Sequence, residues 1–314
     1  MTATPFIDAA TVARLIDYPT LVDRLRDAFV LPPIAPARLS IPIPAMAHAG
    51  GGTLLVMPAL RPGGIIIVKL VTAHPHLAHR PQGSLSTTLL VLSATDGSLL
   101  GLVDGHALTA LRTAATSVLA ARLLARADAR RLLILGAGSV AFALAQAYVA
   151  CRGIDDVTIW ARRPAATEAL AARLGSAGVQ ARVATDLGRA AAVADIISAA
   201  TASTTPLLTQ SMIAPGTHLD LVGGFTPAMR EADDALVAAA RVVVDSPLAI
   251  IEAGDLAGPV ALGRLDPATI TTLANLIAAP TLRGPDEITL FKSVGLALED
   301  LAASELLFER LETP

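Results

Sequence analysis

Two lysines stand out among the residues that could carry chemistry, because 22 of the 24 Lys and Arg residues in this 314-residue chain are arginines. Lys69 lies in an otherwise apolar stretch, residues 65–71, whose composition is typical of a β-strand. An ammonium group there needs a negatively charged partner, and the carboxylate of a substrate would be one. The alternative is a lysine on the open face of an edge strand.

A polar stripe follows on an Ala- and Leu-rich helix that we expect from about residue 106 to residue 126. Its members are spaced i, i+3, i+4 and i+7, so they share one face of the helix; they are Thr109, Arg112, Thr113 and Thr116. Threonine is a poor helix former, and a solvent-exposed face would usually carry Glu, Lys or Gln. The stripe predicts a polar pocket around Arg112, with a solvated helix face as the alternative.

A glycine-rich turn carries the signature of dinucleotide binding. Gly136, Gly138 and Ala141 form G-x-G-x-x-A directly after the apolar run 132–135. The first glycine permits a tight turn, the second lets the backbone approach a pyrophosphate, and the alanine allows close packing of helix on strand. Because a helix N-terminus also favours phosphate, we expect Gly136, Gly138, Ser139 and Val140 to bind the cofactor.

The strand expected at residues 157–160 ends in Ala161-Arg162-Arg163, with no carboxylate at its tip. An enzyme that uses NAD usually has Asp or Glu there to bind the ribose hydroxyls. Two guanidinium groups instead suit a 2′-phosphate. Arg162 and Arg163 therefore predict NADPH as the cofactor, with NADH possible; the alternative is a pair of solvated loop arginines.

Other chemistry finds little support in the sequence. His74, His76 and His79 lie close together, but Pro75 makes the segment a loop and no helical H-E-x-x-H is present, so we predict no metal site. The chain has no G-x-S-x-G and no phosphate-binding loop with its lysine, which argues against a hydrolase or a kinase.

The order of elements predicts an α/β protein with two domains. Residues 1–30 are expected to be helical, and residues 53–57, 64–71, 86–93 and 98–103 to be strands, with a hairpin at Asp96-Gly97. From residue 131 short Val/Ile/Leu runs alternate with helices, which is typical of a parallel sheet covered on both faces. We expect a Rossmann-type doubly wound parallel sheet plus an α+β domain.

The composition raises the question of a membrane, since 53% of residues are hydrophobic, 16% are charged and the mean hydropathy is +0.60. Residues 132–151 and 196–219 lack charge over about the 20 residues that a spanning helix needs. Gly and Pro interrupt both, and no aromatic belt flanks them. We therefore expect a soluble protein.

The charge and cysteine content narrow the possible partners and compartment. A net charge of −3 argues against nucleic acid or an anionic membrane as a partner. The single cysteine, Cys151, leaves no internal disulfide, and the N-terminal residues show no signal-peptide pattern. These features predict a cytoplasmic location.

The chain resembles the ornithine cyclodeaminase/mu-crystallin family over nearly its whole length. The matching blocks are residues 56–59, 68–72, 108–117, 135–138, 252–255 and 291–300. The resemblance implies a homodimer and a discontinuous first domain, residues 1–117 and 293–314, that binds substrate and forms the dimer. Residues 118–292 would form the NAD(P)-binding domain.

The resemblance also implies roles for individual residues. Arg38, Lys69 and Arg112 match positions that grip the substrate carboxylate. Ser293 and Gly295 would lie near the nicotinamide, and Thr113 and Thr201 complete the cofactor contacts that we expect.

Departures from the cyclodeaminase pattern indicate which reaction to expect. That enzyme carries an Asp after Gly-Gly and a Glu before Met-Pro, where this chain has Phe225 and Leu55. The segment around Phe225 looks most like the cyclic imine reductases. The expected activity is NADPH-dependent reduction of Δ1-pyrroline-2-carboxylate or Δ1-piperideine-2-carboxylate to L-proline or L-pipecolate. Phe225 would form an apolar surface against the substrate ring. Lys69 would relay a proton if burial lowers the pKa of its ammonium group.

Three alternatives stay open. The chain could be an amino-acid dehydrogenase of the same family, an ornithine cyclodeaminase, or a non-catalytic, crystallin-like protein that binds NADPH.

Overall fold

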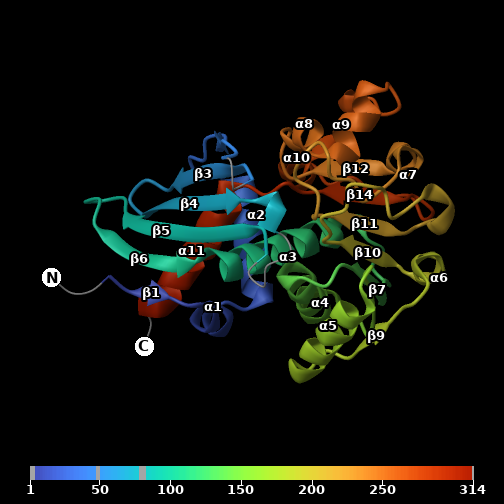
Figure 1. The fold of residues 1–314 in the computed structure, drawn as a ribbon, viewed down its shortest axis with the longest axis horizontal. Helices are drawn as coiled ribbons and strands as arrows, with labels where there is room; N and C mark the ends of the chain where they lie inside the picture. The colour runs from blue at the N-terminus through green and yellow to red at the C-terminus, as the bar shows by residue number, and fades with distance from the viewer. Residues whose placement is uncertain (1–3, 47–49, 78–82, 313–314) are drawn as a thin grey trace. The chain divides into compact units, whose positions relative to one another are not determined.

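The computed structural model describes residues 4–46, 50–77 and 83–312. They divide into two compact units: unit 1 comprises Met1–Arg112 and Leu296–Pro314, and unit 2 comprises Thr113–Gly295. One boundary falls inside helix α3 (Gly105–Leu124) and the other just before α11 (Ala297–Glu312). The sequence analysis put these boundaries after residues 117 and 292. Figure 1 shows the red C-terminal helix α11 among the blue N-terminal elements of unit 1.

Unit 1 is built on a six-stranded sheet in the order β1-β6-β5-β4-β3-β2, antiparallel except where β1 joins β6. Its strands are β1 (Phe6–Ile7), β2 (Leu39–Ile43), β3 (Gly52–Leu60), β4 (Ile65–Ala73), β5 (Leu85–Ser93) and β6 (Leu99–Asp104). Its helices are α1 (Ala9–Leu15), α2 (Tyr18–Val30), the 3₁₀ turn η1 (Pro75–Leu77), the first part of α3, and α11.

Local sequence accounts for several of these boundaries. The expected helix at residues 1–30 is divided in two, because Asp8 and Asp17 each accept a backbone N–H three residues on and start a new helix. The hairpin after β5 forms as predicted, with Gly97 at φ +74° and the Gly97 N–H donating to Ser93 O. Strand β2, which the sequence analysis missed, contains Pro42, and its edge position tolerates the missing N–H.

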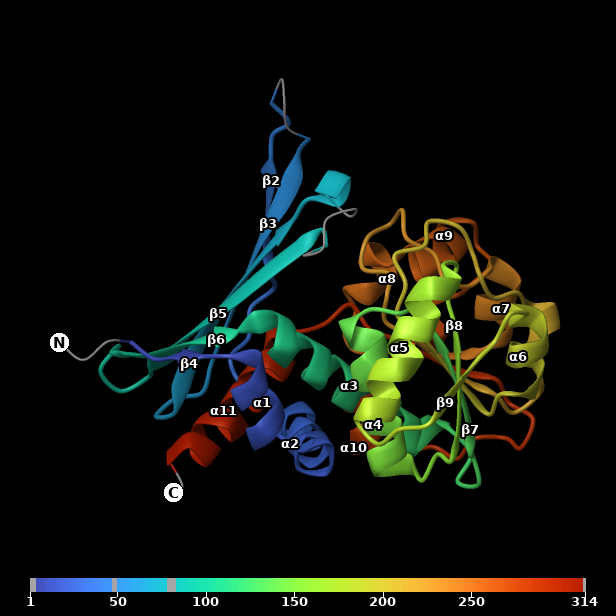
Figure 2. The same ribbon diagram turned by 60° about the horizontal axis from the view of Figure 1, so that its bottom comes forward.

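The helices of unit 1 lie on one face of its sheet. Figure 2 shows α1, α2 and α11 together on that face, and α11 packs on β3 and β4. None of the α-helices in the described part of unit 1 covers the other face. That open face carries a set of half-buried apolar residues: Val56, Pro58, Ile66, Val68, Leu70, Leu90, Leu92 and Leu102.

Unit 2 contains a fully parallel eight-stranded sheet in the order β13-β12-β14-β11-β10-β7-β8-β9. Its strands are β7 (Arg131–Leu135), β8 (Asp156–Trp160), β9 (Ala181–Val183), β10 (Ile196–Ala199), β11 (His218–Leu221), β12 (Arg241–Val244), β13 (Thr271–Thr272) and β14 (Thr289–Lys292). Its further helices are α4 (Ser139–Arg152), α5 (Pro164–Ser176), α6 (Leu187–Val193), α7 (Asp234–Ala239), α8 (Ala249–Glu252), α9 (Gly254–Ala261) and α10 (Leu273–Ala278), with the 3₁₀ turns η2 (Gln210–Met212) and η3 (Pro267–Thr269).

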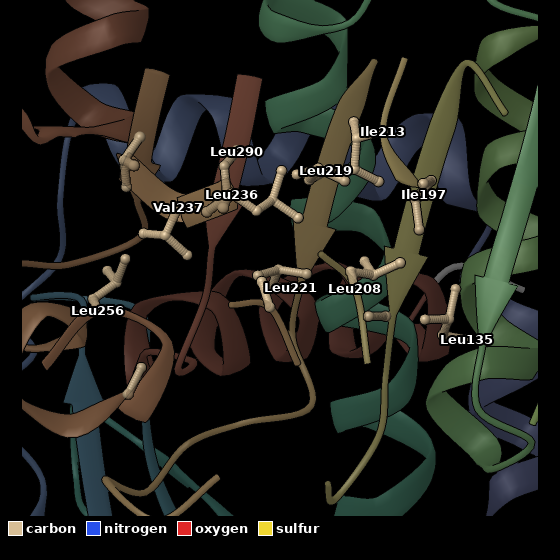
Figure 3. Close-up of a cluster of buried hydrophobic side chains, with 14 of the residues drawn as sticks. Leu135, Ile197, Leu208, Ile213, Leu219, Leu221, Leu236, Val237, Leu256 and Leu290 are labelled. Atoms are coloured by element: carbon tan, nitrogen blue, oxygen red, sulfur yellow. The ribbon is translucent and has the colours of Figure 1, made fainter. Parts of the chain in front are cut away.

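The sheet of unit 2 has helices on both faces, which confirms the predicted doubly wound fold. On one face the central strands contribute Leu135, Ile197, Leu219 and Leu221 to an apolar core that α7 and α9 complete (Figure 3). On the other face α4 packs on β7 and β10. The strand order reverses between β7 and β10, and in such sheets ligands bind outside the carboxyl ends of the strands at this point.

The apolar stretches noted in the sequence are interior elements of unit 2. Residues 132–151 form β7, the glycine turn and α4, whereas residues 196–219 run from β10 into β11. Among the described residues, α3 is long and apolar enough to cross a membrane. Because 72% of its most apolar window is buried inside the protein, α3 has the burial of a core helix.

Candidate active site

Lys69 lies in the interior of unit 1 and faces the helices. β4 is flanked by β3 and β5, and Lys69 pairs with Met57 on one side and Leu89 on the other, both buried. Only 2% of Lys69 is exposed, so an open edge strand is wrong. The partner that burial requires is present in the chain: the Asp300 carboxylate lies 2.5 Å from the Lys69 ammonium nitrogen.

Arg112 joins Lys69 through the same carboxylate. Its Nε donates to Asp300 Oδ1 at 3.0 Å, and its Nη1 pairs with Glu299. Arg112 is 4% exposed, and Thr113 and Thr116 are buried too, so a solvated helix face is also wrong. Glu299 and Asp300 lie in the first turn of α11, where the helix dipole favours negative charge. We call Lys69, Arg112, Glu299 and Asp300 the charge cluster.

Burial lowers the pKa of Lys69 to about 8. Burial is the largest influence and disfavours the ammonium form; Asp300 opposes it, and the nearby positive charge of Arg112 adds to it. Burial also disfavours the charged form of Arg112, but Asp300 and Glu299 outweigh it and raise the Arg112 pKa, so its guanidinium stays charged. Lys69 can therefore exchange a proton near neutral pH, whereas Arg112 serves as a permanent cation.

Arg38 precedes β2 and is half-buried. Leu39 pairs with Val56, so the register of β2 and β3 continued by one residue puts Arg38 beside Met57. Met57 pairs with Lys69 on the next strand, so Arg38, Met57 and Lys69 form one row across the sheet. Adjacent strands are about 4.8 Å apart, so two strand spacings separate the backbones of Arg38 and Lys69 by about 10 Å. Long side chains can cover that span. The three predicted carboxylate-binding residues, Arg38, Lys69 and Arg112, all belong to unit 1.

Phe225 belongs to unit 2. It follows β11 by four residues, is half-buried, and packs against the apolar core of that unit.

Leu55, the position compared with a glutamate of cyclodeaminases, lies on β3 of unit 1. It pairs with Val71, which is two residues from Lys69 on β4, so Leu55 and Lys69 are on the same face of the sheet. That face of the sheet therefore carries an apolar side chain at the position that the sequence analysis compared with the glutamate of cyclodeaminases.

The glycine turn of unit 2 has the shape that a pyrophosphate needs. Gly136 has φ +113°, and a Cβ atom there would lie 2.5 Å from Ala200 O. Gly138 is the N-cap of α4, no side chain caps this helix, and a Cβ at Gly138 would meet nothing within 4 Å. The exposed end of α4, with Ser139 and Val140 in its first turn, thus leaves room for a phosphate beside free helix N–H groups.

The carboxyl ends of the neighbouring strands carry the other predicted cofactor residues. Thr201 follows β10 and is half-buried, whereas Ser293 and Gly295 follow β14 and are buried. Asp245, at the end of β12, fixes that segment: its Oδ2 accepts from Ser293 Oγ at 2.8 Å, Val294 N at 2.8 Å and Gly295 N at 2.7 Å. Thr113 is the first residue of unit 2 and is 8% exposed.

Arg162 and Arg163 follow β8 and are exposed. Arg163 is the N-cap of α5, and Ala161 is half-buried. Neither guanidinium has an ion-pair partner among residues 4–46, 50–77 and 83–312. Both remain available to a ligand at the carboxyl edge of the sheet.

The histidine segment shows no metal-binding geometry in the part of the chain that the structure describes. The rings of His74 and His76 are edge to face at 5.7 Å, and His79 lies outside the described residues. No group of three His, Cys, Asp or Glu side chains that could hold a metal is found among the described residues.

Sequence reasoning assigned no role to five buried acidic residues that organise these sites. They are Glu231, Asp245, Asp255, Glu299 and Asp300. Asp255, Glu299 and Asp300 lie within the blocks 252–255 and 291–300 that carry the family resemblance, and Glu231 lies in the run 223–234 around Phe225. Those segments were the available signal. Asp245 had no such signal except its place after a strand.

Comparison with known proteins reveals extended similarity. The model of the ornithine cyclodeaminase/mu-crystallin family matches residues 9–313. A Delta(1)-pyrroline-2-carboxylate reductase of Paracoccus denitrificans is 39% identical over 255 residues, 80% of this chain and 81% of that protein. The ketimine reductase mu-crystallin of Mus musculus is 32% identical over 269 residues, 85% of this chain and 82% of that protein.

Solved structures show the same architecture. Thermococcus litoralis Delta(1)-pyrroline-2-carboxylate reductase, in complex with NADH and L-proline, has a TM-score of 0.89 to this chain at 28% identity. The similarity covers 97% of this chain and 96% of that one.

Proposed function

Because the chain belongs to the ornithine cyclodeaminase/mu-crystallin family, we propose that it is an NAD(P)H-dependent reductase of cyclic imino acids. The proposed substrates are Δ1-pyrroline-2-carboxylate and Δ1-piperideine-2-carboxylate, which would become L-proline and L-pipecolate. The observation that carries the proposal is buried Lys69, with a pKa of about 8, beside the permanent cation Arg112. Such a pair combines recognition of a carboxylate with a proton donor that works near neutral pH.

The arrangement of the cations supports binding of a carboxylate. With Lys69 protonated, Glu299 and Asp300 neutralise Lys69 and Arg112, so the charge cluster itself is neutral. Arg38 lies level with Lys69 across the sheet, beside Met57. A substrate carboxylate bound there would accept several charge-assisted hydrogen bonds in a fixed orientation.

The proton of Lys69 supplies the second half of the proposed chemistry. When bound, the dihydronicotinamide supplies the hydride. A protonated imine is far more electrophilic than the neutral one, so a nearby acid accelerates reduction. In the proposal the Lys69 ammonium donates to the imine nitrogen, and Asp300 then holds the lysine in place while it takes up another proton.

The apolar character of Leu55 and Phe225 favours a reductase over a cyclodeaminase. Release of ammonia from a diamino acid calls for carboxylates that move protons at the amine, and these two positions offer none. A reductase needs no such groups, because its substrate already contains the C=N bond. The imine reductases among the similar proteins support the same choice.

We propose NADPH as the preferred cofactor, with NADH as a weaker substitute. Arg162 and Arg163 are exposed at the end of β8, where Ala161 leaves space and no carboxylate would repel a 2′-phosphate. One or two guanidinium–phosphate pairs would favour NADPH by charge-assisted hydrogen bonds. The solved reductase from Thermococcus litoralis was observed with NADH, so the test must include both cofactors.

We also propose that the protein is a homodimer through the open face of the unit 1 sheet. Pro58, Val68, Leu90 and Leu102 form one continuous apolar row across four adjacent strands of that face. An apolar sheet face of this extent usually marks an interface. A second copy of the chain offers a self-complementary surface, as a two-fold symmetric dimer requires.

One assay separates the proposed reaction from its alternatives. Purified protein and NADPH are mixed with each cyclic imine, then with pyruvate and ammonia, and loss of nicotinamide absorbance is followed; NADH is tested in parallel. Consumption with the imines alone supports the proposal, and consumption with pyruvate and ammonia would identify an amino-acid dehydrogenase. Binding of NADPH without turnover would point to a crystallin-like protein, and ammonia release from ornithine would point to a cyclodeaminase.

A further inference from the structure

Glu231 connects two loops at the carboxyl edge of the unit 2 sheet. Its Oε1 accepts hydrogen bonds from Thr201 N at 2.7 Å and from Thr201 Oγ1 at 2.8 Å. Its Oε2 accepts from Gly223 N at 3.0 Å. Thr201 lies in the loop after β10 and Gly223 in the loop after β11, so one carboxylate holds both loops.

Two further buried charges hold Glu231 in turn. Asp255 Oδ1 accepts from Glu231 N at 2.7 Å and from Ala232 N at 3.0 Å. Asp255 Oδ2 pairs with Lys292 Nζ at 3.0 Å, and Lys292 Nζ lies 4.0 Å from Glu231 Oε2. All three charged side chains are fully buried, so the second lysine of the chain belongs to this network and not to the protein surface.

The two loops fit together without room for side chains. A Cβ atom at Gly223 would lie 2.1 Å from Thr201 O and 2.5 Å from Glu231 Oε1. At Gly224 it would lie 3.3 Å from both Asp255 Oδ2 and Lys292 Nζ. The loop after β11 therefore rests directly on the charged network.

We propose that Glu231, held by Asp255 and Lys292, is a positioning residue that locks the loop after β10 to the loop after β11 and thereby shapes the nicotinamide half of the cofactor site. The inference rests on the proposed function, since it assigns the carboxyl edge to a dinucleotide. Thr201 is a predicted cofactor contact, and Gly223 lies two residues before Phe225, the predicted wall of the substrate ring. Glu231 acts on both through hydrogen bonds.

A carboxylate suits this position because three donors converge on it. An ionised carboxylate is acceptor-only, whereas an amide or a protonated carboxyl presents a donor to one of the three. Burial raises the pKa of Glu231 to about 7, against the effect of Lys292, while Asp255 raises it further. The charged groups that face Glu231 are Lys292 from β14 and Asp255 from α9. Uptake of a proton by Glu231 would leave this network neutral and would weaken the hydrogen bonds that hold the two loops.

The test compares Glu231→Gln with Glu168→Gln, which removes the same charge from an exposed position on α5. Affinity for NADH is measured by energy transfer from Trp160, the single tryptophan, to the bound dihydronicotinamide. NADH is used because it lacks the 2′-phosphate, which itself titrates near neutral pH. We expect roughly tenfold or greater weakening in Glu231→Gln, as for loss of a hydrogen bond to a charged group, and wild-type affinity in Glu168→Gln.

The pH dependence distinguishes positioning from a loss of overall stability. In the wild type, NADH affinity should decrease as the pH falls through about 7, and this dependence should be absent from Glu231→Gln. Equal NADH affinity in both proteins, or the same pH dependence in both, would overturn the inference. Wild-type protein that binds neither NADH nor NADPH would instead overturn the proposed function.

Hydrogen exchange of the cofactor-free wild type gives a readout that needs no variant to fold. Protection factors for residues 200–203 and 222–224 should decrease as the pH falls through the Glu231 pKa, whereas those of β7 should not. A decrease in protection limited to the two loops supports the proposed role of Glu231. Unchanged protection, or a uniform decrease across unit 2, contradicts that role.

Discussion

Replacing Asp300 by asparagine removes the negative charge that Lys69 and Arg112 share while preserving the shape of the side chain. The asparagine carbonyl oxygen still accepts the bond from Arg112 Nε, which the native carboxylate accepts at 3.0 Å. Burial and Arg112 both lower the pKa of Lys69, and Asp300 is the largest influence that raises it. We therefore expect the Lys69 pKa in Asp300→Asn to fall below its wild-type value of about 8.

Coulomb's law gives the size of the effect. The carboxylate charge is shared by two oxygens, so the charge centres lie farther apart than the 2.5 Å between Lys69 Nζ and the nearer Asp300 oxygen. Two unit charges about 4 Å apart interact by about 4 kcal/mol at an effective dielectric constant near 20, which is about a thousandfold change in proton affinity. With a pKa of about 8, the ammonium form of Lys69 exceeds the amine about tenfold at neutral pH. In Asp300→Asn the amine would exceed the ammonium about a hundredfold, so a reaction that uses the Lys69 proton should slow by about two orders of magnitude.

The assay measures kcat/KM for the cyclic imine across the pH range. The rate of the wild type should fall as the pH rises through the Lys69 pKa of about 8, and in Asp300→Asn this fall should move to lower pH. The matched control is Glu305→Gln, which removes a charge from the same helix α11 but acts on Arg61, at 2.7 Å, and not on Lys69. Its profile should match that of the wild type.

One result would refute this reasoning. If Asp300→Asn folds, as judged by its circular dichroism, and its rate falls at the same pH as that of the wild type, then Lys69 is not the titrating acid. A lower rate with an unmoved profile would mean that Asp300 affects only the orientation of the bound substrate.

Three further changes test the fold and the assembly. Gly136→Ala should destabilise the protein by at least about 1–3 kcal/mol and abolish NADPH binding, because φ is +113° and the added Cβ would lie 2.5 Å from a carbonyl oxygen. Denaturant unfolding measures the loss of stability, and the control Gly175→Ala, with open space around the added Cβ, should not lower the stability. Burial raises the pKa of Asp195, which is 6% exposed, but hydrogen bonds from Arg131 and Arg130 together outweigh burial and lower this pKa to about 2. Its folded pKa lies below the unfolded one, so about 2 kcal/mol of stability present above about pH 4 should be lost as the pH falls through about 2, and Asp195→Asn should flatten that part of the acid unfolding curve. Leu90→Glu should convert the proposed dimer to a monomer in light scattering, whereas Val193→Glu, at an exposed site in unit 2, should not; a monomeric wild type would contradict the proposed interface.

Elements set by short-range patterns were predictable from the sequence. The strand, glycine turn and helix at residues 131–152 form where G-x-G-x-x-A predicts them, because the turn, the helix start and the apolar strand are all local features. The hairpin after β5 follows from Asp96-Gly97 for the same reason. Short elements with weaker patterns were missed: β13 has two residues, and β2 contains a proline that disfavours a strand.

The partners of the buried charges could not be predicted from local patterns. Burial of Lys69 implies a negative partner, and the sequence analysis looked for it in a substrate. Asp300 fills that role from the far end of the chain; it also binds Arg112, which is 188 residues away in sequence. Neither periodicity nor motif spacing reports a contact of that separation, and only the return of α11 to unit 1 creates it.

The two lysines of the chain lead to a common argument about why these charges are buried. Lys69 and Lys292 each pair with an aspartate inside a different unit, and each aspartate also binds a second functional segment. Desolvation of such pairs is expensive, and apolar side chains of similar volume often stabilise a fold as well or better. In a chain with only 16% charged residues, stability alone therefore gives no reason for two buried networks of this kind. A chemical reason fits both places: in unit 1 the network sets the pKa of the proposed acid, and in unit 2 it fixes the loops that would receive the nicotinamide.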